Sequence, residues 1–264
     1  MILLSGIRLK KKNNNKVAIV TGAGSGIGRA VALGLAKEGL DVYLAGRKKA
    51  KLIITRQESI KEKNKGSCYV IKCDVSKEIS VRKLFFIIKK QHGRLDLLFN
   101  NAGIGAKSSS IDNIKFNDWK KVIDTNINGM FLCAKYAYKI MKKQEPKGGR
   151  IINNGSISAF SPRPGSSAYT TSKHAITGLT KSISLDGRND NILCSQIDIG
   201  NAETDLTKSF KEGVIQSSGN TLKEPTINVE DVAKVIINIL KLPLDTNILN
   251  LTILANKMPF IGRG

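Results

Sequence analysis

Tyr169 and Lys173 are the residues of this chain whose types and spacing most directly suggest chemistry. They stand four residues apart in a segment whose apolar positions continue at Ile176, Leu179 and Ile183, a helical spacing. Both side chains therefore project from one face of a predicted helix, where an ammonium beside a phenol favours the phenolate as a base. The pair alone is a weak signal, because a tyrosine packed on a helix with a solvated lysine nearby gives the same pattern.

Ser156 is a third candidate for the same chemistry. It follows the apolar run at 150–155, which predicts a strand, and so it stands at a strand tip. From there its hydroxyl can form a hydrogen bond with a substrate oxygen. The three side chains together predict proton transfer at an oxygen atom.

A glycine-rich turn lies near the start of the chain. Residues 16–20 form a short apolar run rich in β-branched residues, which predicts a buried strand, and a helical pattern follows residue 28. Glycines between a strand and a helix let the backbone approach a pyrophosphate at the positive end of the helix. The candidate phosphate-binding residues are Thr21, Gly22, Gly24, Ser25, Gly26, Ile27 and Gly28. A glycine turn that only packs the helix on the strand is the alternative.

The end of the second predicted strand, 41–45, bears on which dinucleotide binds. In an NAD-binding fold this strand end usually carries an acidic residue on the ribose hydroxyls, whereas an arginine nearby accommodates a 2′-phosphate. Here Gly46 fills the acidic position and Arg47 follows it. The sequence therefore predicts NADP(H) in preference to NAD(H). A solvated helix start in a basic protein is the other interpretation.

Further strands and helices follow in alternation. A third strand, 68–75, carries Asp74, which could accept a hydrogen bond from an adenine amine or cap a helix starting near Ser76. A long helix around 117–142 contains Asn126, whose amide needs partners or marks a kink bound to a backbone group or water. The other predicted strands are 95–99, 150–155, 191–197 and 248–254.

This alternation predicts the fold class. It indicates an α/β protein, a doubly wound, Rossmann-like parallel sheet of about seven strands in a single domain. The length of 264 residues fits one such domain. Residues 1–15 are expected to be a mobile tail, 16–264 the domain, and 205–226, where the pattern loosens, a lid over the substrate.

Composition excludes several classes of function. The net charge of +22 comes from basic residues scattered along the chain without interleaved aromatic residues, so nucleic acid is not expected as a partner. The four cysteines lack metal-ligand or disulfide spacing, and no metal is expected. No apolar run reaches the ~18 residues of a membrane span, and the N-terminus resembles no secretory signal. A cytoplasmic protein without membrane partners is expected.

With these pieces in place, the chain resembles the short-chain dehydrogenase/reductase family over nearly all of residues 16–264. The motifs that carry the resemblance read TGAGSGIG (21–28), CDV (73–75), NNAG (100–103), TNING (125–129), GS (155–156) and YTTSK (169–173). The resemblance implies an NAD(P)(H)-dependent oxidoreductase of the NADP-preferring branch. Hydride would pass between nicotinamide and a small carbonyl or secondary alcohol substrate.

The resemblance also implies roles for single residues. Tyr169 would be the acid and base, Lys173 would assist it and hold the nicotinamide ribose, Ser156 would orient the substrate oxygen, and Asn126 would anchor a water. The remaining implied cofactor contacts are Arg47, Asp74, Val75, Asn101, Ala102, Gly103, Ile199 and Thr204. The chain departs from the family at Ile199-Gly200, where many members carry Pro-Gly.

Two further expectations concern alternatives and assembly. A non-catalytic dinucleotide-binding regulator on the same fold is the other function class, because fold does not fix function. The helices around 117–142 and 168–184 carry small or apolar residues on more than one face. Together with the family resemblance, this predicts a homodimer or homotetramer built on these helices.

Overall fold

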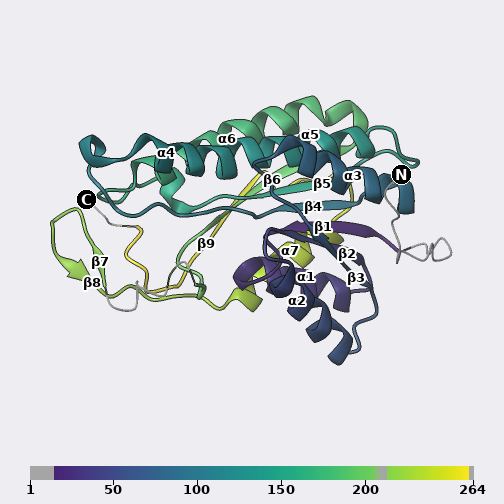
Figure 1. Cartoon of the computed structure of the whole chain (residues 1–264), viewed down its shortest axis with the longest axis horizontal. Helices are drawn as coiled ribbons and strands as arrows, with labels where there is room; N and C mark the ends of the chain where they lie inside the picture. The colour runs from purple at the N-terminus through teal and green to yellow at the C-terminus, as the bar shows by residue number, and fades with distance from the viewer. Residues whose placement is uncertain (1–14, 206, 208–212, 262–264) are drawn as a thin grey trace.

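The computed structural model describes residues 15–205, 207 and 213–261. Within them, seven parallel strands form one sheet in the order β3-β2-β1-β4-β5-β6-β9. The strands are β1 (Val17–Thr21), β2 (Asp41–Gly46), β3 (Cys68–Lys72), β4 (Leu97–Asn100), β5 (Gly149–Asn154), β6 (Ile192–Ile199) and β9 (Asn250–Ile253). Helices cover both faces of the sheet (Figure 1), so the predicted doubly wound, single-domain α/β fold is confirmed.

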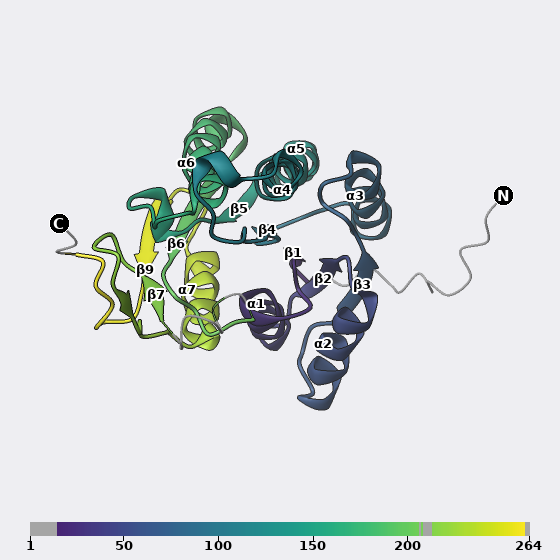
Figure 2. The ribbon, with the colours of Figure 1, turned by 60° about the vertical axis from the view of Figure 1, so that its left-hand side comes forward.

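The helices form two layers, one on each face of the sheet (Figure 2). The lower layer consists of α1 (Gly26–Lys37), α2 (Lys49–Lys61) and α7 (Val229–Lys241). The upper layer consists of α3 (Glu78–His92), α4 (Phe116–Ile123), α5 (Gly129–Met141) and α6 (Ser167–Asp186).

The sheet is buried on both faces, which explains its continuous apolar runs. Neighbouring residues of β1 point to opposite sides: Val20 packs with Leu35 of α1, and Ile19 with Leu84 of α3. Each face therefore has its own apolar core. The two cores fix the sheet between the helical layers.

The order of the strands places a crevice at their carboxyl ends. From β1 the chain proceeds to β2 and β3 on one side, then returns to β4, β5 and β6 on the other. In such open sheets the ligand binds outside the carboxyl ends of the strands, where the order reverses. The glycine turn at 21–28, the end of β4 and the end of β5 all meet at this edge.

The helix predicted around 117–142 is interrupted. After α4, residues Asp124–Asn128 form a π-helical turn, and α5 begins at Gly129. Single π turns inside helices often mark functional sites. This turn carries Asn126.

The helix predicted to start near Ser76 is α3, and the alternative that Asp74 caps it is wrong, because Lys77 stands at the cap position. α3 begins at Glu78, because Oδ1 of Asp74 accepts hydrogen bonds from the backbone N–H (3.1 Å) and hydroxyl (2.8 Å) of Ser76. Asp74 thus closes a turn ahead of the helix instead of capping it.

The sixth strand is longer than predicted. It was expected to end at Ile197, but β6 pairs with β9 as far as Ile199, and the next N–H, of Gly200, donates to Ile253 O at 2.8 Å. Ile199, where many family members carry proline, therefore belongs to the sheet.

Two predicted segments fall partly or mostly outside the described residues. Of the predicted tail, residues 1–14 lie outside them. Of the predicted lid, 206 and 208–212 lie outside, and the described part contains a hairpin of β7 (Val214–Ile215) and β8 (Thr221–Leu222).

Candidate active site

Tyr169 and Lys173 lie one turn apart on the same face of α6, as their spacing predicts. The Nζ atom of Lys173 lies 5.4 Å from the centre of the Tyr169 ring. It donates a hydrogen bond to the backbone carbonyl of Asn154 at 2.7 Å, and the lysine is only 4% exposed. A carbonyl positions the ammonium without neutralising it, so its positive charge remains beside the half-buried phenol.

Ser156 lies just beyond the end of β5, as predicted. Its Oγ accepts a hydrogen bond from Ser158 N at 3.1 Å, and its own N–H donates to Oδ1 of Asp198 at 2.8 Å. A serine hydroxyl that accepts one bond can still donate its proton. The Ser156 hydroxyl therefore keeps its proton for donation to another group.

Asn126 is fully buried in the π turn, and its amide is satisfied by protein groups. Its Oδ1 accepts from Ile104 N at 2.9 Å, and its Nδ2 donates to Ile104 O at 3.0 Å and to Ser172 Oγ at 3.1 Å. Asn126 thus joins the loop after β4 to the residue preceding Lys173. Of the two interpretations given for Asn126, the amide bound to a backbone group fits this geometry.

A cavity of about 480 Å³ lies along the carboxyl edge of the sheet, next to these side chains. Most of the predicted cofactor-binding residues line it. They are Gly22, Ser25, Gly26, Ile27, Gly28, Arg47, Asp74, Val75, Asn101, Ala102, Gly103, Tyr169, Lys173 and Thr204.

Three predicted cofactor residues do not line this cavity. Thr21 is buried, and its Oγ1 accepts from the N–H groups of Asn101 (2.8 Å) and Ala102 (2.9 Å), which joins the ends of β1 and β4. Gly24 packs against α2, and Ile199 lines a second cavity.

The glycine turn needs glycine at particular positions. Gly22 and Gly26 have φ values of +69° and +52°, in the left-handed region. A Cβ at Gly28 would lie 2.3 Å from the carbonyl oxygen of Gly22. The turn therefore brings bare backbone to the first turn of α1, which carries no acidic residue. Such a helix start suits a pyrophosphate.

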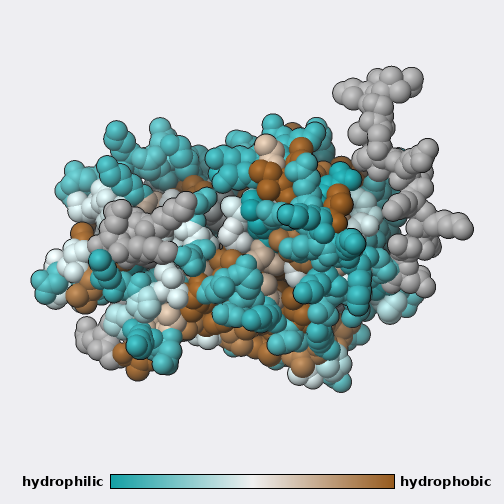
Figure 3. Space-filling view, turned by 90° about the horizontal axis from the view of Figure 1, so that it is seen from below, coloured by the Kyte–Doolittle hydropathy of each residue, from teal (hydrophilic) through white to brown (hydrophobic). Residues whose placement is uncertain are grey.

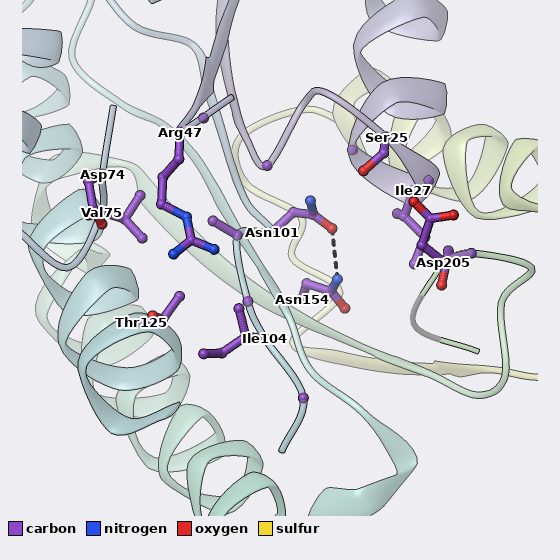
Figure 4. Close-up of a pocket in the computed structure, with 18 of the residues that line it drawn as sticks. Ser25, Ile27, Arg47, Asp74, Val75, Asn101, Ile104, Thr125, Asn154 and Asp205 are labelled. Carbon is purple, nitrogen blue, oxygen red and sulfur yellow. Dashed lines mark hydrogen bonds between the residues drawn. The ribbon is translucent and has the colours of Figure 1, made fainter. Parts of the chain in front are cut away.

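Figure 4 shows how the labelled side chains surround the first cavity. Arg47 is exposed and extends across the opening, with Asp74 and Val75 on one side. Opposite them, Asn154 Nδ2 donates to Asn101 Oδ1 at 2.8 Å, which links the ends of β5 and β4.

A second cavity, of about 510 Å³, adjoins the first. Tyr169, Asn154 and Thr204 line both cavities, whereas Ser156 lines only the second. Tyr169 therefore lies where a ligand in the first cavity would meet one in the second, and Ser156 lies on the side of the second cavity. This arrangement suits transfer between a long polar cofactor and a smaller substrate.

The family model for short chain dehydrogenase matches residues 16–214. The chain belongs to this family. A 3beta-hydroxysteroid dehydrogenase of Mediterraneibacter gnavus is 38% identical over 198 residues, covering 74% of this chain and 69% of that protein. A farnesol dehydrogenase of Aedes aegypti is 33% identical over 246 residues, covering 90% of this chain and 95% of that protein.

Among solved structures, the actinorhodin polyketide ketoreductase with NADPH superposes with a TM-score of 0.81. It shares 25% identity and covers 91% of this chain and 96% of its own. As a short-chain dehydrogenase, the chain is an NAD(P)(H)-dependent oxidoreductase that transfers hydride between a nicotinamide and a carbonyl or alcohol. These findings give no support to the non-catalytic alternative.

Sequence reasoning about this dehydrogenase missed a polar cluster on the wall of the second cavity. Nη2 of Arg163 contacts Oε2 of Glu224 at 2.5 Å and Oδ1 of Asn201 at 3.2 Å, and Gln216 donates to Oε1 of Glu224 at 3.0 Å. The cluster ties the hairpin region to the loop before α6. Loosely patterned segments gave no signal for it.

Membrane-spanning helices and metal-ligand clusters are two further features that the geometry of the described part of the chain can reveal. No helix there is long and apolar enough to cross a membrane, and no three histidine, cysteine or acidic residues gather as metal ligands. All four cysteines are free and buried. Burial raises the pKa of Cys194 to about 12 and that of Cys133 well above its usual value, so these thiols are not nucleophiles.

Proposed function

We propose that this dehydrogenase uses NADP(H) and that Tyr169 is its acid and base. The observation that carries the proposal is the position of Tyr169 at the junction of the two cavities, with Lys173 beside it. Ser156, just beyond the end of β5, lines the second cavity together with Tyr169. Proton transfer and substrate orientation thus come from two independent elements.

In the reducing direction, NADPH held along the first cavity would supply a hydride, and the residues at the cavity junction would handle the proton and the substrate oxygen. Tyr169 gives its phenolic proton to the carbonyl oxygen, and the Ser156 hydroxyl donates a hydrogen bond to that oxygen as negative charge develops on it. Lys173 stabilises the phenolate that remains. Oxidation of an alcohol runs through the same groups in reverse.

Asn126 acts on this machinery through its neighbours. Its bonds to Ile104 and Ser172 hold the loop lining the first cavity against α6. We assign it the role of keeping Lys173 in register with the cofactor cavity, and the water that the family resemblance implies at Asn126 stays a prediction.

Gly46 and Arg47 support NADP(H) as the preferred cofactor, with NAD(H) as a possible substitute. No carboxylate stands at the end of β2 to repel a 2′-phosphate, and the Arg47 guanidinium lies at the first cavity. The solved ketoreductase carries NADPH.

The second cavity supports a substrate with an apolar body. Ile157, Ile199, Val214 and Ile215 contribute to its wall. The named relatives act on a 3β-hydroxysteroid and on farnesol. We infer an apolar ketone or alcohol as the substrate class and residues 205–226 as its lid, since both Val214 and Ile215 belong to that segment.

Three further proposals concern the oligomeric state, the cellular compartment and the extent of the folded unit. We infer a homodimer or homotetramer, because Phe131 on α5 is 47% exposed and Gly178 on α6 has open space in front of it. We infer the cytoplasm, a reducing compartment, because the four thiols are free. Residues 16–264 are proposed as the single folded unit.

The test of the activity uses NADPH with a 3-oxo steroid, farnesal, acetoin and cyclohexanone. Tyr169→Phe should abolish turnover and leave the Kd for NADPH nearly unchanged, because only the proton-transferring hydroxyl is lost. Lys173→Ala should impair both. If the Phe variant turns over the best of these compounds at a rate near wild type, Tyr169 is not the acid and base.

A further inference from the structure

Asp198 is a fully buried carboxyl group that the mechanism above does not use. It lies near the end of β6, and its Oδ1 accepts the backbone N–H of Ser156 at 2.8 Å. The two residues are 42 positions apart in sequence, so the pairing of β5 with β6 brings them together. A buried carboxylate thus holds the backbone of the serine that reaches the substrate cavity.

The partners of this carboxylate are neutral hydrogen-bond donors. Besides Ser156, Gln196 Nε2 donates to Oδ1 at 2.7 Å and Asn250 Nδ2 donates to Oδ2 at 2.7 Å. Burying a charge is costly unless donors satisfy it, and hydrogen bonds to a charged acceptor are about twice as strong as neutral ones. The Ser156 N–H is therefore held more firmly than a backbone carbonyl would hold it.

Gly155 provides an independent sign that the chain is fitted around this carboxylate. A Cβ at that position would lie 2.1 Å from Asp198 Oδ1. Glycine is thus required directly before Ser156 if the carboxylate is to reach the next N–H. The position of the Asp198 carboxylate therefore depends on the absence of a side chain at Gly155.

The same network extends to the helix that bears the acid and base. Gln196 Nε2 also donates to Oγ1 of Thr177 at 3.1 Å, and Thr177 stands one helical turn after Lys173. Ser156, just beyond the end of β5, and Lys173 on α6 are therefore held relative to each other through Gln196 and Asp198.

We propose that Asp198 is a positioning residue for the reaction, acting through Ser156. It occupies the Ser156 N–H, so this group cannot serve the substrate, and Ser158 N occupies one acceptor site of Oγ. The Ser156 hydroxyl is then left to donate a hydrogen bond into the second cavity. This inference rests on the role proposed for Ser156.

The test compares Asp198→Ala, Asp198→Asn, Ser156→Ala and the double variant Ser156→Ala/Asp198→Ala. The probe is whichever of the four carbonyl compounds gives wild type the highest kcat/KM. Ser156→Ala should lower kcat about 10²-fold or more, as for loss of an oxyanion donor. Asp198→Ala should lower kcat about 10²-fold by misplacing that donor, with the Kd for NADPH unchanged.

Non-additivity separates positioning from a general structural role. The double variant should be no slower than Ser156→Ala alone, whereas a structural role would add a second loss. Asp198→Asn keeps an acceptor for the Ser156 N–H and should recover most of the rate. Asp245→Ala is the control, because it removes the carboxyl group of an exposed residue outside this network; its kcat should stay near wild type.

The outcomes distinguish this inference from the proposed function. If Ser156→Ala leaves kcat unchanged, the role proposed for Ser156 is overturned. If Ser156→Ala lowers kcat strongly but Asp198→Ala leaves it unchanged, only the positioning role of Asp198 is overturned. If Asp198→Ala does not fold, Asp198→Ser takes its place in the test. The serine hydroxyl is polar but too short to reach the Ser156 N–H. If no compound is reduced, amide exchange decides: faster exchange confined to residues 155–159 in the Asp198 variants supports positioning, and unchanged exchange overturns it.

Discussion

At the scale of residues, the partner of Lys173 decides what its charge can do. The ammonium donates to the carbonyl of Asn154 instead of pairing with a carboxylate, and it lies beside the Tyr169 ring. Removing a buried ammonium from water is costly, and a carbonyl contact offsets part of that cost without cancelling the charge. The charge is therefore left for the roles proposed above for Lys173.

The cofactor preference is a prediction about two residues. Gly46→Asp with Arg47→Ser should move the ratio of kcat/KM for NADPH to that for NADH roughly tenfold to hundredfold toward NADH, the size of one or two charged hydrogen bonds. The change is sterically feasible, because a Cβ at Gly46 would approach Leu52 Cδ2 no closer than 3.3 Å.

The matched control for this prediction is Lys49→Ser on α2, which removes a nearby positive charge and leaves Gly46 and Arg47 in place. Its effect on the ratio should be small. A wild-type enzyme that already prefers NADH would contradict the assignment.

At the scale of elements, the amino end of β2 and β3 is stabilised by aromatic contacts with α3. Tyr43 stacks on Tyr69 with ring centres 5.0 Å apart, and His92 at the end of α3 meets Tyr43 edge-on at 5.6 Å. Burial lowers the pKa of His92, against a smaller opposing effect of the Asp41 carboxylate. His92 is therefore a neutral packing group in the folded protein.

This depressed pKa predicts how stability depends on pH. The unfolded chain binds a proton at His92 more readily than the folded protein, so the free energy of unfolding should fall as pH drops from about 6.5 through the lower folded value. Urea unfolding at pH 7.5 and 5.5 measures this. His92→Phe should lose part of the difference between the two pH values, whereas His174→Gln should keep all of it, since His174 is exposed. Equal pH dependence in wild type and His92→Phe would contradict the prediction.

At the scale of the whole molecule, the surface offers two apolar regions for contact with another copy. The predicted region lies on α5 and α6, where Phe131 is exposed. Ala134 and Ala137, expected on a second face of α5, instead pack on the sheet. On the opposite layer, seen from below in Figure 3, apolar groups stand among polar ones. Ile54 of α2, which belongs to this layer, is 44% exposed.

Assembly through α5 and α6 predicts different effects for substitutions on the two regions. Phe131→Glu should dissociate the oligomer, because a charge would be buried in the interface, whereas Ile54→Glu should leave it intact. Mass measurement in dilute solution gives the result. Wild type found only at the monomer mass of 28.7 kDa would exclude the oligomer, and dissociation by Ile54→Glu alone would move the interface to α2.

The sequence alone determined those features that depend on neighbours along the chain. Tyr169 and Lys173 share a face because four residues make one helical turn, and the glycine turn follows from its place between a strand and a helix. The alternation of strand and helix patterns was enough to predict the parallel sheet and a layer of helices on each of its faces. Element ends were less predictable, since the start of α3 depends on a side chain of Asp74 and the end of β6 on its pairing with β9.

Only the tertiary structure decided which distant polar groups meet. Arg150 would be placed at the surface by its type, yet it is 1% exposed and its Nη2 donates to the carbonyls of Leu242 (2.9 Å), Pro243 (2.6 Å) and Thr246 (3.0 Å). Asp198 likewise meets Ser156 only because β5 and β6 pair. Local periodicity fixes the direction of a side chain, but a buried polar group persists only where the fold supplies its partners, and those partners come from strands and loops far away in sequence.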